Sequence, residues 1–177
     1  DAAVNEAVVG TPTLQPIFES TNGDFNNDGF IDVVIPSMSG LKLFTNNGNS
    51  NFIATQISTG VANGINKNDL NGDGNLDLVT GYYGIDIYIG NGNGTFNPPV
   101  ALSLPTDGPI QDIVIEDLDS DGIKDMILRD NSNVRSLKGI SSTSFSVVST
   151  YTFSNLNGLA VGNYNSDFIK DVMILTG

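Results

Sequence analysis

Four acidic stretches of nine residues contain the side chains best suited to chemistry. They read DFNNDGFID at 24–32, DLNGDGNLD at 69–77, DLDSDGIKD at 117–125 and NYNSDFIKD at 163–171. Each has carboxylate or carboxamide oxygens at positions 1, 3, 5 and 9, and three of the four have glycine at position 6. A plain Asp-Gly turn needs one polar side chain and one glycine, so it does not account for four recurrent oxygens. Oxygens at alternate positions around a glycine bend are typical of Ca²⁺ loops.

Each stretch predicts a calcium site with side-chain ligands at positions 1, 3, 5 and 9 and a backbone carbonyl at position 7. The expected ligands are Asp24, Asn26, Asp28, the Phe30 carbonyl and Asp32; Asp69, Asn71, Asp73, the Asn75 carbonyl and Asp77; Asp117, Asp119, Asp121, the Ile123 carbonyl and Asp125; and Asn163, Asn165, Asp167, the Ile169 carbonyl and Asp171. An EF-hand would need a glutamate at position 12, where these loops have Ile35, Thr80, Leu128 and Ile174. The aspartate at position 9 is therefore expected to close each site. Magnesium is the weaker alternative, because it tends to keep several waters.

The four sites are not expected to be equal. The third has four carboxylates and, on charge alone, should bind calcium most tightly, unless its loop is less rigid. The fourth has two carboxylates, and Phe168 replaces its glycine at a position that requires positive φ. We therefore expect three good sites and a weaker fourth.

The amino-acid composition argues against several classes of function. The 177 residues include 20 acidic and seven basic side chains, and the four stretches hold 12 of the acidic ones. A net charge of −13 with few cations argues against nucleic-acid binding. Histidine and cysteine are absent, which removes the commonest general base and any thiolate site. No apolar run is long enough to span a membrane. The start at Asp1 suits a processed segment, and the Asn-, Gly- and Ser-rich surface suits an extracellular protein.

The acidic stretches mark a repeat, because they begin 45, 48 and 46 residues apart. Short apolar strands flank each one, IDIYI and LKLF alternate strictly, and Asn-Gly pairs stand where hairpins turn. The pattern predicts an all-β fold, a β-propeller with blades of four antiparallel strands; a flat sandwich is the alternative. We expect one partial propeller domain over 1–177, with repeats at about 15–60, 61–105, 106–152 and 153–177 and a possible closing strand at 1–14. About three and a half blades result. We expect that further blades of a longer chain, rather than a second copy of this chain, complete a seven-bladed ring.

The motifs GDFNNDGFIDVVI, NDLNGDGNLDLVTG, EDLDSDGIKDMI and VGNYNSDFIKDVMI resemble the FG-GAP/VCBS repeats of integrin α-subunit propellers and of many secreted microbial proteins. The resemblance covers nearly all of the chain after residue 15. It implies a propeller, usually seven-bladed, with Ca²⁺ in the loop between the first two strands of each blade. The fourth loop departs from the pattern. Family membership predicts architecture better than it predicts a ligand.

The function predicted is an extracellular, calcium-stabilised binding module for adhesion or matrix contact, with a protein or glycan partner. A carbohydrate-binding lectin is the alternative, and a secreted polysaccharide-active enzyme is the least favoured, because no catalytic set is present. Tyr82 and Tyr83 are candidate ligand contacts; the alternative is that one of them packs between blades while the other has no role. Arg129 is a third candidate, or a solvated charge. Asn93 lies in an Asn-Gly-Thr sequon, which would be glycosylated only in a eukaryotic source.

Overall fold

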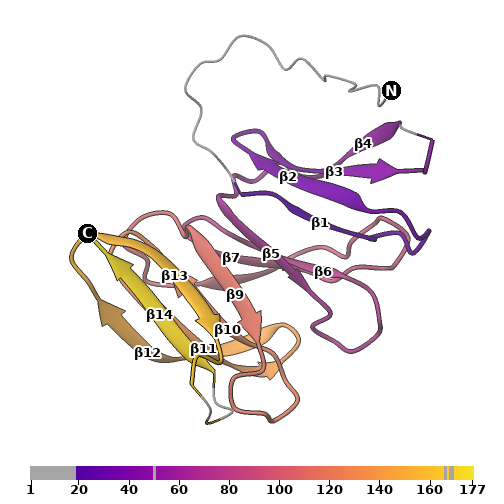
Figure 1. Ribbon diagram of the computed structural model, residues 1–177. Helices are drawn as coiled ribbons and strands as arrows, with labels where there is room; N and C mark the ends of the chain where they lie inside the picture. The colour runs from indigo at the N-terminus through magenta and orange to yellow at the C-terminus, as the bar shows by residue number, and fades with distance from the viewer. Residues whose placement is uncertain (1–18, 50, 166, 168–169) are drawn as a thin grey trace.

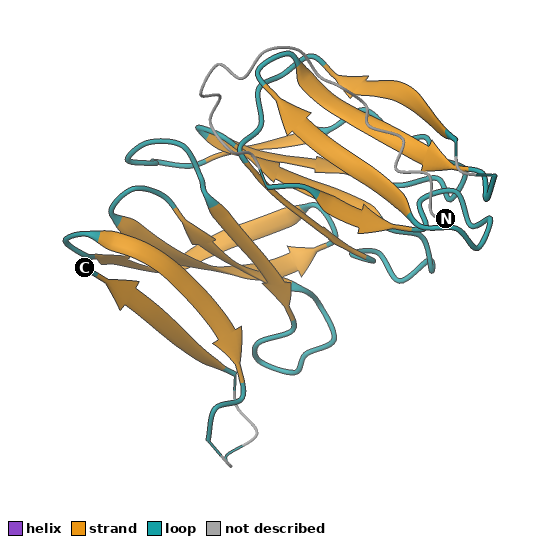
Figure 2. Ribbon diagram, turned by 45° about the horizontal axis from the view of Figure 1, so that its top comes forward, coloured by secondary structure: helices purple, strands orange, loops and turns teal. Residues whose placement is uncertain are grey.

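The computed structural model describes residues 19–49, 51–165, 167 and 170–177. Within these residues the chain forms fourteen β-strands and no helix (Figure 1; Figure 2), so the all-β prediction is confirmed. The predicted closing strand at 1–14 lies outside the described residues. The described part of the chain has no helix long and apolar enough to cross a membrane.

The strands pair into four antiparallel sheets, called blades one to four, each in chain order. Blade one contains β1 (Thr21–Gly23), β2 (Asp32–Ser37), β3 (Gly40–Asn46) and β4 (Phe52–Ser58). Blade two contains β5 (Gly64–Asn68), β6 (Asp77–Gly81), β7 (Gly84–Tyr88) and β8 (Val100–Ser103). Blade three contains β9 (Asp112–Glu116), β10 (Asp125–Arg129), β11 (Asn133–Ser141) and β12 (Ser144–Thr152). Blade four contains β13 (Leu156–Gly162) and β14 (Asp171–Thr176).

Alternating apolar residues explain how the blades stack. In β7, Ile85 and Ile87 pack in the core between blades two and three, whereas Tyr88 belongs to the core between blades one and two. In β10, Met126 and Leu128 face blade two and Ile127 faces blade four. The second strands β6 and β10 are buried along their whole length because both of their faces are covered by neighbouring blades.

The blades are arranged as a fan whose first strands lie next to one another (Figure 1). Strand β5 contacts both β1 and β9, and β9 contacts β13. This arrangement confirms the predicted blades of four antiparallel strands, and the fourth blade has two of its strands. Closure into a seven-bladed ring stays a prediction.

A row of asparagine side chains joins the first strands of blades two and three and the residues just before those strands. The carboxamides of Asn63, Asn66 and Asn68 donate to the backbone carbonyls of the residues 47 positions later, Ile110, Ile113 and Ile115, at 3.1, 2.6 and 3.4 Å. This separation of 47 residues is close to the repeat spacings of 45, 48 and 46 residues. Neighbouring blades are therefore held in register by polar contacts as well as by apolar cores.

Candidate functional site

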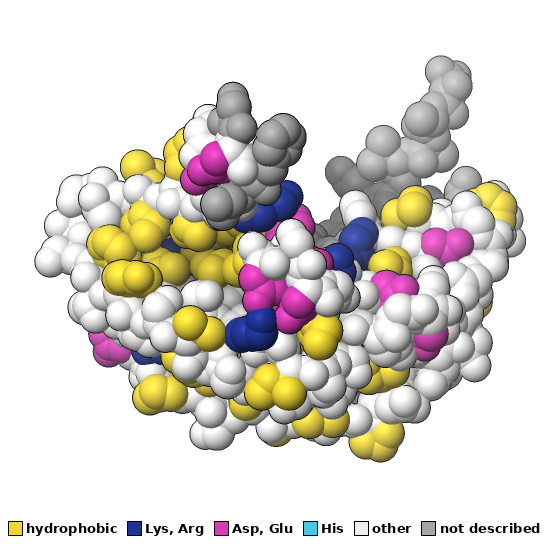
Figure 3. Space-filling model, turned by 90° about the horizontal axis from the view of Figure 1, so that it is seen from below, with side chains coloured by type: hydrophobic (Ala, Val, Ile, Leu, Met, Phe, Trp, Pro, Cys, Tyr) yellow, Lys and Arg dark blue, Asp and Glu magenta, His cyan; other side chains and the backbone are white. Residues whose placement is uncertain are grey.

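Three of the acidic loops connect the first and second strands of complete blades. Loop one (24–32), loop two (69–77) and loop three (117–125) join β1 to β2, β5 to β6 and β9 to β10. Loops one and two meet each other and the turn after β7: Asn27 donates to the side chain of Asn75 at 2.8 Å, and the Gly94 amide donates to the Phe25 carbonyl at 2.9 Å. Acidic side chains gather on the face shown in Figure 3, with lysine and arginine side chains beside them.

The aspartate at position 9 fixes the root of each loop. Asp32, Asp77 and Asp125 are almost fully buried. One oxygen of each accepts a backbone N–H from position 2 of its own loop, at 2.8–3.0 Å. The other oxygen accepts a backbone N–H from the third strand or just beyond it, at 2.8 Å, from Asn46, Gly90 and Gly139 respectively. Burial raises the pKa of Asp77, although the N–H groups of Gly90 and Leu70 oppose that rise.

The glycine at position 6 makes the predicted bend. Gly29, Gly74 and Gly122 have φ of 87°, 86° and 88°, and their N–H groups donate to the position-1 carboxylates at 2.8, 2.9 and 3.0 Å. Position 4 also has positive φ, at 57° for Asn27 and 63° for Ser120. The loop backbone therefore turns twice through a conformation that most residues avoid.

The position-5 carboxylates lie at the exposed end of the loops. Asp28, Asp73 and Asp121 each accept the N–H of position 7 at 2.8–2.9 Å. The Asn75 N–H and then the Asn71 side chain lower the pKa of Asp73. In loop three the Lys138 ammonium, followed by the Ile123 N–H, lowers the pKa of Asp121.

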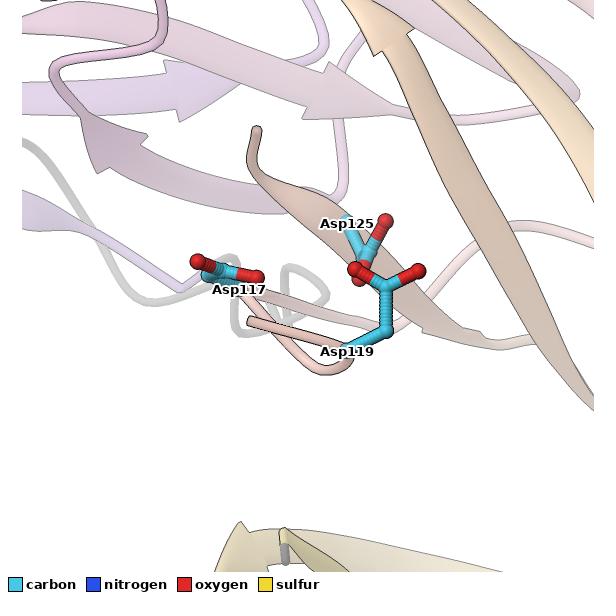
Figure 4. Close-up of side chains that lie close together, drawn as sticks. All are labelled: Asp117, Asp119 and Asp125. Atoms are coloured by element: carbon cyan, nitrogen blue, oxygen red, sulfur yellow. The ribbon is translucent and has the colours of Figure 1, made fainter. Parts of the chain in front are cut away.

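The donor set fits a hard divalent cation. In loop three, one carboxylate oxygen from each of Asp117, Asp119 and Asp125 lies within 4.8 Å of the others (Figure 4), so this cluster could hold a metal ion. All of the side chains at positions 1, 3, 5 and 9 of the loops offer oxygen, which suits Ca²⁺ rather than a softer metal. Residues 30, 75 and 123 supply the expected carbonyls at position 7, and their role as ligands stays a prediction.

A lysine outside loop three, which the sequence did not single out, contacts its carboxylates. The Lys138 ammonium, from β11, forms ion pairs with Asp119 and, at 2.9 Å, with Asp121. Strand pairing, not spacing along the chain, brings it there.

The residue at position 2 of each loop also has a role that the sequence did not reveal. It is apolar or aromatic in all four loops, as Phe25, Leu70, Leu118 and Tyr164. Phe25 and Leu70 are buried in the cores between blades. Their side chains anchor the loops while their N–H groups bind the position-9 aspartates. The recurrent apolar residue was the signal that could have revealed this role.

Loop four keeps part of the arrangement. Asp171 accepts the Tyr164 N–H at 2.9 Å and the Asn165 carboxamide at 3.3 Å, and the Asp167 N–H donates to Asn165 at 2.9 Å. Asn163, Asn165 and Asp167 are exposed. Phe168 and Ile169 lie outside the described residues.

The candidate ligand residues lie on the opposite face. The Tyr82 and Tyr83 rings meet edge to face with centroids 4.5 Å apart, and Tyr83 is 60% exposed. Both line a cavity of about 230 Å³ together with Asp86, whose pKa burial raises. The two tyrosines are therefore available to a ligand, and Asp86 joins them as a residue that sequence reasoning did not find.

Arg129 is not a solvated charge. It is 8% exposed, and its guanidinium contacts Asp112 and Gln111. With these two residues it lines a polar cavity of about 330 Å³ that also includes Glu19. Burial and then Asp112 raise the pKa of Glu19, while Arg129 opposes the rise.

A further groove separates blades one and two. A cavity of about 320 Å³ lies between β4 and the segment after β7. It is lined by Thr55, Gln56, Ile57, Tyr88, Gly94, Thr95, Phe96, Asn97, Pro98 and Pro99. Aromatic and amide side chains therefore meet where two blades diverge, which is a suitable setting for a small polar ligand.

Comparison with protein families identifies the repeats. A family model described as an FG-GAP-like repeat matches residues 24–80 and again 69–128, together more than half of the chain. The chain belongs to the FG-GAP-like repeat family. Each match of the family model begins at the first aspartate of an acidic loop in this FG-GAP-like protein. It ends inside the second strand of the following blade. The resemblance predicted from the sequence is confirmed.

Comparisons with individual proteins are more distant. No curated protein sequence matches the chain. Among solved structures, an Agrocybe aegerita lectin that specifically recognises non-reducing terminal N-acetylglucosamine is similar, with a TM-score of 0.60 and 15% sequence identity. The similarity covers 89% of this chain and 47% of that chain, so the FG-GAP-like chain spans about half the length of the lectin. At this identity the likeness concerns the fold alone.

Proposed function

We propose that this chain is part of an extracellular, calcium-stabilised β-propeller that binds a partner through its blade surfaces, for adhesion or matrix contact. The observation that carries the proposal is the repetition of one loop geometry: a buried position-9 aspartate, a glycine bend and three outer oxygens occur in loops one, two and three. A turn alone does not require that set. The absence of histidine and cysteine from the sequence supports binding rather than catalysis.

Calcium would be held by the oxygens at positions 1, 3, 5, 7 and 9 of each loop. When bound, it would neutralise carboxylates that otherwise repel one another at short range. Other groups of the protein hold these ligands in place. The position-9 carboxylate is oriented by two backbone N–H groups, and the position-2 side chain anchors the loop to the core. We propose three such sites, with loop four as a weaker one.

Calcium titration by calorimetry tests this proposal. The intact chain should bind three or four ions, and Asp73→Asn should remove one of them because it takes a carboxylate from loop two. Asp73 is exposed, so the fold should survive the substitution. The matched control is Asp107→Asn, which alters an exposed aspartate outside the loops and should leave the stoichiometry unchanged. Absence of calcium binding to the folded chain would reject the proposal.

A glycan is the second candidate ligand. The similar fold of a lectin and the aromatic grooves at Tyr82, Tyr83 and Tyr88 favour it. Glycans ending in N-acetylglucosamine are the first class to test. Binding on a glycan array in calcium, lost on Tyr83→Ala or in EDTA, would support a lectin. Absence of any glycan signal in calcium would reject the lectin and leave a protein partner, and release of unsaturated sugars from polysaccharides would instead indicate an enzyme.

A further inference from the structure

Loop three differs from loops one and two because a lysine on a neighbouring strand pairs with two of its carboxylates. The Lys138 ammonium contacts Asp119 and Asp121, the carboxylates at positions 3 and 5. Its side chain is 44% exposed, so solvent reaches the pair. Lys138 projects from β11, the third strand of blade three, beside the backbone N–H of Gly139 that binds Asp125.

Blades one and two show what normally occupies this place. Asn46, Gly90 and Gly139 are equivalent, because each donates its N–H to the position-9 aspartate of its blade. The preceding residues are therefore equivalent too, and they are Thr45, Ile89 and Lys138. Only the third carries a charge. The cation is matched to the loop that has four carboxylates rather than three.

We propose that Lys138 is a counter-ion built into loop three, which competes with the divalent ion and keeps this loop ordered without it. The inference rests on the proposed calcium function and adds a rank order among the sites. Four carboxylates alone would make loop three the tightest site; Lys138 reverses this, so that loops one and two fill first.

The physical basis is competition for the same oxygens. An ammonium group at hydrogen-bond distance from Asp121 neutralises part of the charge that would attract the metal. Binding of an ion at positions 3 and 5 requires Lys138 to move into solvent, which its exposed side chain permits. The lysine therefore weakens the site without blocking it.

The position-6 glycines provide a reporter for each loop. The amides of Gly29, Gly74 and Gly122 donate to position-1 carboxylates, so their NMR signals should shift when those oxygens bind calcium. In the intact chain we expect the Gly122 midpoint at a calcium concentration about threefold above that of Gly74. Lys138→Met, which keeps the apolar stem, should lower the Gly122 midpoint by about tenfold and leave Gly29 and Gly74 unchanged.

Two variants serve as controls. Lys138→Arg keeps the charge and should retain the high midpoint. Lys124→Gln removes an equal charge from loop three itself, but Lys124 forms no ion pair within the described part of the chain, so it should shift Gly122 much less. In EDTA, amide hydrogen exchange at Gly139 should be slower than at Gly90, and Lys138→Met should remove that difference.

The outcomes separate the two proposals. A shift of Gly29 and Gly74 with calcium, together with equal Gly122 midpoints for Lys138→Met and Lys124→Gln, would overturn the counter-ion and leave the calcium sites standing. Failure of all three glycines to respond would instead reject the calcium function.

Discussion

At the scale of single residues, the aspartate at position 9 has two tasks. It is a candidate metal ligand, and it is also the acceptor that ties the loop to the third strand, as Asp77 does through Leu70 and Gly90. The spacing along the chain predicted the first task. The second could not be predicted, because Gly90 lies 13 residues further on and comes close only when β6 and β7 pair.

Asp77→Asn should therefore destabilise the protein even without metal. The carboxamide can accept one N–H, but its NH₂ group would face the other, leaving a buried donor unpaired at about 1–3 kcal/mol. Urea unfolding in EDTA measures this loss, with the exposed Asp73→Asn as the control. Equal stability of the two variants would contradict the structural role of Asp77.

The two glycines of loop two should respond differently to substitution. Gly72 occupies position 4, where the other loops have Asn27 and Ser120 at positive φ, so Gly72→Asn should change stability by less than about 0.5 kcal/mol. Gly74 has φ of 86°, further from the usual left-handed region than Gly72 at 76°, and Gly74→Asn should cost about 1 kcal/mol or more. Neither Cβ would meet another atom within 4 Å, so the comparison isolates backbone strain. Urea unfolding of both variants in EDTA would measure it, and a larger loss at Gly72 would contradict the argument.

Asp86 should make stability depend on pH. Burial raises the pKa of Asp86 above its ordinary value of 3.8, so the folded state holds this proton more tightly than the unfolded state. Its contribution to stability is then greatest below that value and is lost as the pH rises through the raised pKa. Asp86→Asn should stabilise the protein at neutral pH and have little effect near pH 3.8. Urea unfolding of both proteins across this range, at fixed EDTA, would measure the difference; a benefit that grows toward acid would contradict this sign.

At the scale of elements, the row of asparagines explains how one blade is set against the next. Strand β9 pairs with β10 on one side only, and its other edge faces β5. Asn66 and Asn68 cover the carbonyls on that edge. The alternation of apolar and polar residues and the Asn-Gly turns were sufficient to predict the strands. Asparagine is also a common turn residue, so its role between blades could not be predicted from the sequence.

Asn66→Ala should weaken the contact between blades two and three. The Ile113 carbonyl would lose its 2.6 Å partner at the inner edge, at a cost of about 1 kcal/mol. Hydrogen exchange of β5 and β9 amides should accelerate while β3 and β4 in blade one stay unchanged. Asn97→Ala, in an exposed segment outside the strands, is the control. Uniform acceleration through all blades would indicate global unfolding instead.

At the scale of the whole molecule, the sequence repeat determines where the blades and their acidic loops lie. The repeat length and the loop motif predicted a fan of blades with acidic loops at equivalent places, and the structure has that arrangement. The grooves that separate blades could not be predicted, because they depend on how far β4 and the segment after β7 diverge. The acidic loops also concentrate much of the net charge of −13 on parts of one surface (Figure 3).

Salt should therefore stabilise the chain mainly when calcium is absent. In EDTA, the carboxylates of each loop repel one another, and raising choline chloride to about 0.5 M should raise the melting temperature by screening them. In saturating calcium the same salt should have a much smaller effect, because the bound ions already offset that charge. Thermal unfolding followed by circular dichroism under the four conditions measures the difference. An equal rise with and without calcium would show that the repulsion lies outside the loops and that calcium does not relieve it.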